Sequence, residues 1–91
     1  MMYLVTYDID DDKIRNKISK ILEGFGVRVQ ESVFECNLNK EEYDKLLKRL
    51  TKFSRENFNI RIYPLCKDCY SKAVGIGEIK IFPGLKGYEI V

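Results

Sequence analysis

The first 26 residues change from extended to helical periodicity. Residues 2–9 are mainly β-branched and aromatic with two largely apolar faces, which predicts a central strand. The acidic run 10–12 then offers an N-cap and a first turn whose charge complements a helix dipole. Apolar residues follow at helical spacing, and we expect this helix to end at Gly24 or Gly26 in a left-handed conformation.

The middle of the chain repeats this order. Residues 27–36 have the pattern of a second strand, but the apolar parity changes near Glu31, so a bulge or bend is expected there. Asn39 and the glutamate three residues later predict a capping box at the start of a second helix. Residues 58–63 alternate between apolar and polar, which predicts a third strand that stops at Pro64.

The remainder of the chain is rich in glycine and proline. Residues 66–72 suit about one helical turn, while 73–76 and 78–82 are candidates for short strands. The apolar end, residues 88–91, finds little to pair with inside so small a sheet. We therefore expect it to add to the edge of a neighbour's sheet.

Two helices and about four strands in this order predict an α+β fold. The order fits a ferredoxin-like βαββαβ sandwich with both helices on one face of an antiparallel sheet. Ninety-one residues allow a single domain, with a core over about residues 1–72 and a C-terminal dimerising arm over 73–91. So short a chain is marginal as a monomer. A homodimer that exchanges the C-terminal strand would cover the open face of the sheet.

Composition adds a compartment and a type of partner. Three cysteines without a secretory signal predict reduced thiols in the cytoplasm, and no apolar run is long enough for a membrane helix. The first twelve residues carry a net charge of −4 and the remainder +6. This asymmetry suits a polyanionic partner and a metal cation. Because histidine is absent, catalysis would need carboxylates, cysteines or a cofactor.

The cysteines have a suggestive spacing. Cys66 and Cys69 are separated as in a zinc knuckle, but a structural zinc site needs two such pairs or two histidines, and only Cys36 remains. A thioredoxin-type pair would begin a long helix after a strand, a context that Pro64 does not supply. Packing or incidental thiols are the favoured interpretation.

Asp8 is the strongest candidate for chemistry. It ends the first predicted strand, where a helix cap does not explain it. The carboxylate either pairs with a base such as Arg15 or Lys13 or binds a hard cation, and the residues alone favour the salt bridge.

Three segments together resemble a known family. These are Tyr7-Asp8-Ile9 before an acidic helix start, the segment Gly-Val-Arg-Val-Gln-Glu-Ser-Val-Phe-Glu at 26–35, and residues 61–69 with their paired cysteines. They resemble the Cas-two family, the small CRISPR-associated adaptation nucleases. The resemblance implies a homodimer of ferredoxin-like subunits with exchanged C-terminal strands. It also implies a metal-dependent endonuclease, cutting RNA or DNA, that takes part in the acquisition of new spacers.

The resemblance assigns roles to individual residues. Asp8 from each subunit would be the catalytic residue and would bind magnesium, with manganese as an alternative, across the two-fold axis. Nucleic-acid contacts would come from Tyr7, Arg15, Lys17 and Arg28, although Tyr7 equally suits packing and Arg15 a salt bridge with a neighbouring aspartate. Phe34 suits the core or the dimer interface better than base stacking. The alternative function is a non-catalytic dimeric DNA scaffold for the larger CRISPR integrase.

Overall fold

The structure, a computed structural model, describes residues 1–53, 58–77 and 88–90. Its elements in chain order are β1 (Met2–Ile9), α1 (Asp12–Glu23), β2 (Val27–Gln30), β3 (Val33–Asn37), α2 (Lys40–Thr51), β4 (Phe58–Leu65), α3 (Lys67–Ser71), β5 (Ala73–Gly75) and β6 (Tyr88–Ile90).

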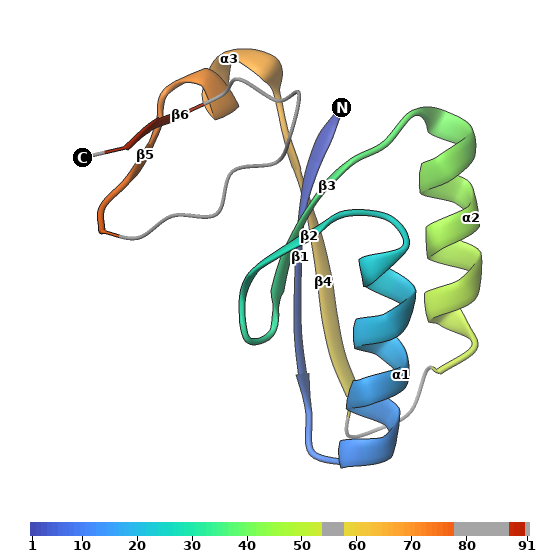
Figure 1. Cartoon of the computed structure of the whole chain (residues 1–91). Helices are drawn as coiled ribbons and strands as arrows, with labels where there is room; N and C mark the ends of the chain where they lie inside the picture. The colour runs from blue at the N-terminus through green and yellow to red at the C-terminus, as the bar shows by residue number, and fades with distance from the viewer. Residues whose placement is uncertain (54–57, 78–87, 91) are drawn as a thin grey trace.

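An antiparallel sheet of order β2-β3-β1-β4 forms the centre of the fold. Helices α1 and α2 lie side by side on one face of the sheet, and α3 and β5 lie on the other side (Figure 1). This is the expected α+β, ferredoxin-like arrangement. Its core fills the space between the sheet and the two long helices, and the most deeply buried side chains are Val5, Ile18, Leu22, Phe34, Cys36 and Leu46.

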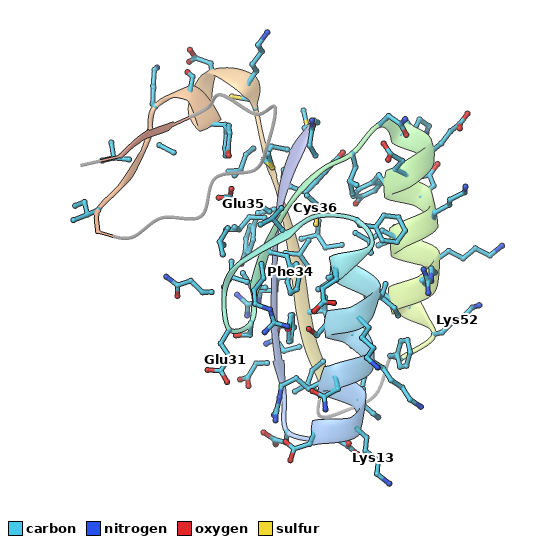
Figure 2. The ribbon with its side chains drawn as sticks, viewed as in Figure 1. Lys13, Glu31, Phe34, Glu35, Cys36 and Lys52 are labelled. Atoms are coloured by element: carbon cyan, nitrogen blue, oxygen red, sulfur yellow. The ribbon has the colours of Figure 1, made fainter. Side chains whose placement is uncertain are left out.

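The segment 27–36 differs from the single bulged strand that its pattern predicts. It is a hairpin, in which β2 pairs antiparallel with β3 and the register shifts between Arg28 and Gln30. The parity change therefore marks a reversal of the chain in addition to a local irregularity. The reversal puts Phe34 on the face covered by the helices, and Glu35 leaves β3 on the opposite side (Figure 2).

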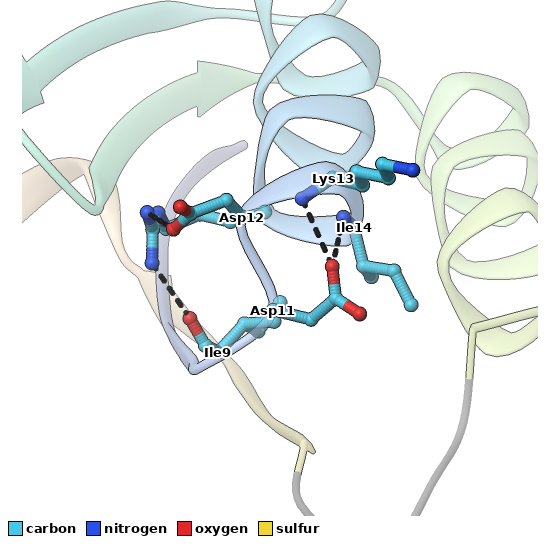
Figure 3. Close-up of polar contacts among 6 residues, drawn as sticks. Ile9, Asp11, Asp12, Lys13 and Ile14 are labelled. Atoms are coloured by element: carbon cyan, nitrogen blue, oxygen red, sulfur yellow. Dashed lines mark hydrogen bonds and ion pairs between the residues drawn. The ribbon is translucent and has the colours of Figure 1, made fainter.

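The start of α1 follows the predicted chemistry. Asp11 is the N-cap, and its Oδ1 accepts hydrogen bonds from the backbone nitrogens of Lys13 at 2.9 Å and Ile14 at 3.2 Å (Figure 3). These bonds satisfy two of the amide groups that the first turn of a helix leaves without an internal acceptor. The predicted capping box of α2 is also confirmed, with Asn39 and Glu42 bonded reciprocally.

The prediction of a left-handed glycine at the end of α1 is wrong. Gly24 caps the helix with φ −76°, a right-handed conformation that any residue adopts. Gly26 is needed for a different reason, because a Cβ there would lie 2.3 Å from the carbonyl oxygen of Glu35 and 2.5 Å from Sγ of Cys36. The backbone of β3 lies too close to Gly26 for a side chain at this position.

The predicted stop at Pro64 is also wrong, because β4 continues through Pro64 to Leu65. β4 is an edge strand of the four-stranded sheet, and an edge leaves some backbone N–H groups without a strand partner. A proline is therefore tolerated there.

Among the C-terminal elements, α3 contacts the face that α1 and α2 leave open. α3 is the single helical turn predicted, and its Tyr70 is buried with the hydroxyl donating to Glu35 Oε1 at 3.1 Å. β6 pairs in parallel with β5 of the same chain. The expected exchange of the C-terminal strand between subunits stays a prediction. The predicted strand at 78–82 lies outside the described residues. Among the residues described, no helix has the length and apolar character needed to cross a membrane.

Candidate functional site

Asp8 lies on the open face of the sheet, at the end of the central strand β1. Alternation along the strand exposes Asp8 while its neighbours Tyr7 and Ile9 are buried, at 5% and 3% relative exposure. Asp8 lies opposite Asn59 in the register of β1 and β4. Together they line an open depression of about 350 Å³, whose other lining residues are Thr6, Tyr7, Arg61 and Tyr63.

The Asp8 carboxylate has no hydrogen bond or ion pair with any other residue that the structure describes. The salt bridge with Arg15 or Lys13 that the residues alone favour is therefore not formed. Arg15 instead pairs with Asp12 and donates from Nη1 to the carbonyl oxygen of Ile9 at 3.0 Å (Figure 3). Asp8 is left available to a ligand from outside the chain.

Three polar side chains of β4 complete the depression, and sequence reasoning gave them no role. Arg61 donates from Nε to Asn59 Oδ1 at 3.2 Å and from Nη1 to the Tyr63 hydroxyl at 3.3 Å. The hydrogen bond and charge interaction with Tyr63 raise the pKa of Arg61 above its ordinary value. Alternation along β4 already places these three residues on one face, but only the pairing of β4 with β1 brings them beside Asp8.

The rings of the two aromatic candidates pack in the core on the opposite face of the sheet, although Tyr7 also borders the depression. Tyr7 donates from its hydroxyl to the carbonyl oxygen of Glu31 at 3.3 Å, and its ring centroid lies 6.3 Å from that of Phe34 in a stacked arrangement. Phe34 is fully buried. In this structure both side chains pack in the core under the helices.

Arg28 is committed to contacts within its own chain. Its guanidinium lies 5.2 Å from the centroid of the Phe34 ring, donates to the carbonyl oxygen of Glu31 at 3.0 Å and to Ser19 Oγ, and lies 3.6 Å from Glu23 Oε1. Arg28 therefore secures β2 to α1. Lys17, by contrast, is exposed on α1 without an ion pair to any other described residue, and its contact with nucleic acid stays a prediction.

The donor set of the depression suits a hard cation better than a soft one. Within the described part of the chain, no three histidine, cysteine or acidic side chains are grouped so that they could hold a metal ion together. Asp8 contributes one carboxylate, with amide and hydroxyl oxygens nearby from Asn59, Tyr63 and Thr6. Magnesium is commonly held by one or two carboxylates together with waters and substrate phosphate. An open, oxygen-lined depression with one unpaired carboxylate fits that pattern.

The three cysteines divide into two environments. Cys36 is fully buried, and that burial, with the nearby charge of Glu35, raises the pKa of its thiol to about 12. The packing interpretation is confirmed for Cys36. Cys66 and Cys69 are both exposed, so packing does not explain them.

Known proteins match the chain over most of its length. Residues 1–73 match the family described as CRISPR associated protein Cas2. A CRISPR-associated endoribonuclease Cas2 from Archaeoglobus fulgidus is 44% identical over 94 residues and all of both chains, and one from Chloroflexus aurantiacus is 45% identical over 86% of each.

Solved structures agree with the sequence matches. Streptococcus pyogenes Cas2 has a TM-score of 0.68 and 38% identity, covering 75% of this chain and 89% of that one. A chain of a partial Cas6-RT-Cas1–Cas2 complex has a TM-score of 0.62 and 33% identity, covering 79% and 86%. The chain therefore belongs to the Cas2 family of CRISPR-associated proteins.

Proposed function

We propose that this protein is a metal-dependent endonuclease that hydrolyses phosphodiester bonds of RNA or DNA during the acquisition of CRISPR spacers. The observation that carries the proposal is the exposed carboxylate of Asp8, which is unpaired among the described residues and faces an open polar depression. The relatives named endoribonucleases support the reaction class.

The residues around the depression have complementary tasks. Asp8 holds a divalent cation, magnesium or manganese, together with waters and substrate oxygens. When bound, such a cation lowers the pKa of a coordinated water and offsets negative charge on the phosphate. Arg61 binds a non-bridging phosphate oxygen, and its bonds to Asn59 and Tyr63 fix the orientation of the guanidinium.

A homodimer would complete this site. One carboxylate per chain is a sparse set of ligands, and a two-fold axis near Asp8 doubles it. The surface also supplies apolar area for an interface, because Tyr63, Val74 and Ile76 are 43%, 58% and 78% exposed. In this proposal the C-terminal arm crosses to the partner, and β6 exchanges its position beside β5 for one on the partner's sheet.

Truncation of the arm tests the exchange. Removal of every residue after Pro83 deletes β6, and we expect this to weaken the dimer. Light scattering over a range of protein concentrations should then show the truncated dimer dissociating at concentrations where the full-length dimer is still intact. A truncated protein that is as fully dimeric as the full chain would contradict the exchanged strand.

A second function, a DNA scaffold for the integrase Cas1, also has a specific observation in its favour. Lys13, Lys17 and Lys20 lie exposed on α1, and none forms an ion pair within the described residues. Such cations would contact a duplex backbone without recognising sequence. A similar chain occurs in the solved complex that contains both Cas1 and Cas2.

One set of assays separates the two functions. Wild type and Asp8→Asn are incubated with single-stranded RNA, single-stranded DNA and duplex DNA, in magnesium and in a chelator, and duplex affinity is measured in parallel. The enzyme proposal expects magnesium-dependent cleavage that Asp8→Asn abolishes, with duplex binding unchanged. Cleavage at the wild-type rate by Asp8→Asn would overturn it. Spacer acquisition that survives Asp8→Asn but fails when Lys13, Lys17 and Lys20 become glutamate would favour the scaffold.

A further inference from the structure

Cys66 and Cys69 form a pair of exposed thiols directly after β4, and neither lines the depression described above. Cys66 is the N-cap of α3, and its Sγ accepts a hydrogen bond from the backbone nitrogen of Cys69 at 3.2 Å. The Cys66 sulfur is thus folded back over the residue that carries the second thiol. Both residues are exposed to solvent, whereas the third cysteine, Cys36, is buried.

The two thiols are chemically unequal. Hydrogen bonds from the Cys69 side chain and the Cys69 backbone N–H lower the pKa of Cys66, while bonding to Cys66 and its charge raise the pKa of Cys69. Asp68 lies between them, but its carboxylate is paired with Lys72 Nζ at 3.0 Å. This arrangement distinguishes an attacking thiolate from a second thiol held close to it.

We propose that Cys66 and Cys69 form a reversible redox site, which closes to an intramolecular disulfide on exchange with a small disulfide such as oxidised glutathione. The Cys66 thiolate attacks one sulfur of the oxidant, forms a mixed disulfide and releases one glutathione thiolate. Cys69 then loses its proton, attacks Cys66 Sγ and releases the second glutathione. The cysteine pair loses two electrons and two protons, and the oxidant is reduced to two thiols.

Closure would act on the contact that holds α3 to the sheet. Tyr70 follows Cys69 directly, and its hydroxyl bonds to Glu35 on β3. A disulfide between residues 66 and 69 restrains the backbone of the same turn. This redox site is independent of the proposed nuclease function, so it can be tested without a cleavage assay.

The test is thiol labelling of the folded, full-length protein with mass spectrometry. Reduced wild type, Cys66→Ser and Cys69→Ser are treated with oxidised glutathione, quenched in acid and alkylated, and the modified peptides are identified. Cys36 is a reference within the same molecule, because a buried thiol with a pKa of about 12 stays unlabelled while the protein is folded.

Wild type should lose both exposed thiols and gain a disulfide between residues 66 and 69 that dithiothreitol reverses. Cys69→Ser should stop at a glutathione adduct on Cys66, and Cys66→Ser should form adducts about tenfold more slowly. Wild type that carries separate glutathione adducts, links two chains, or keeps both thiols free would overturn the proposal. The wild-type result decides it even where a variant unfolds, which labelling of Cys36 would reveal.

Discussion

The two faces of the central sheet use the same residue types in opposite ways. On the face covered by α1 and α2, the Arg28 guanidinium stacks over Phe34 and donates hydrogen bonds to Ser19 and to a backbone carbonyl. On the open face, Arg61 is exposed and is only oriented by its neighbours on β4. The covered face is built for stability, and the open face keeps charged groups available for a ligand.

This difference shows why residue type alone does not identify a site. A β-strand sends alternate side chains to opposite faces, so Tyr7 and Asp8 are neighbours in sequence but occupy different environments. The first is buried in the core and the second lies at an open depression. Substitutions on the two faces should therefore separate loss of stability from loss of activity.

The largest effect is expected from Phe34→Ala on the covered face. Phe34 is fully buried and supports Arg28, so its removal should lower the free energy of unfolding by about 3–5 kcal/mol. Asn59→Ala on the open face is the control, because Asn59 is exposed, and it should cost less than about 1 kcal/mol. Urea denaturation followed by circular dichroism measures both. Equal losses in the two variants would contradict the division between the faces.

A smaller loss of stability is expected at Gly26, which lies between α1 and β2 and close to β3. Gly26→Ala places a methyl group against the backbone of Glu35 and the Cys36 sulfur, and we expect a loss of about 1–3 kcal/mol. Gly24→Ala adds the same group 3.3 Å from one helical carbonyl, at an ordinary φ, and should change stability by less than about 1 kcal/mol. Chemical denaturation of the two variants compares them, and a tolerated Gly26→Ala would show that the hairpin can move.

Substitution of Arg61 should affect cleavage, whereas substitution of Arg28 should affect stability. Arg61→Ala should slow cleavage about tenfold, because phosphate loses a charged donor, and should leave stability nearly unchanged. Arg28→Ala should lower stability by about 1 kcal/mol, because the stacking on Phe34 and the hydrogen bonds to α1 are lost, and should cleave at the wild-type rate. Cleavage kinetics and unfolding curves on the same samples would show whether the effects separate in this way.

Much of the fold was predictable because it follows from local patterns. The N-cap of α1 and the capping box of α2 depend on residues three apart, and both were identified from sequence. The hairpin at residues 27–37 was not, since a change of apolar parity arises equally from a bulge and from a turn. The role of Gly26 was also missed, because it depends on a contact with residues nine and ten positions later.

The candidate site was predictable only in part. Asp8 stood out because no cap or core role suits a carboxylate at the end of a strand. Its expected salt bridge was wrong, since Arg15 turns to Asp12 and to the carbonyl of Ile9. The site also includes three residues of β4, namely Asn59, Arg61 and Tyr63. They come beside Asp8 only because β4 pairs with β1, about fifty residues earlier in the chain, and a single sequence does not reveal that pairing.

The most direct measurement compares Asp8→Asn with Asp10→Asn in a cleavage assay over a range of magnesium concentrations. Both aspartates are exposed and lie two residues apart, but only Asp8 lines the depression. We predict that Asp8→Asn cleaves at least about 100-fold more slowly than wild type, that Asp10→Asn is unchanged, and that both unfold like wild type. Equal cleavage rates in the two variants would contradict the assignment of Asp8 as the metal ligand.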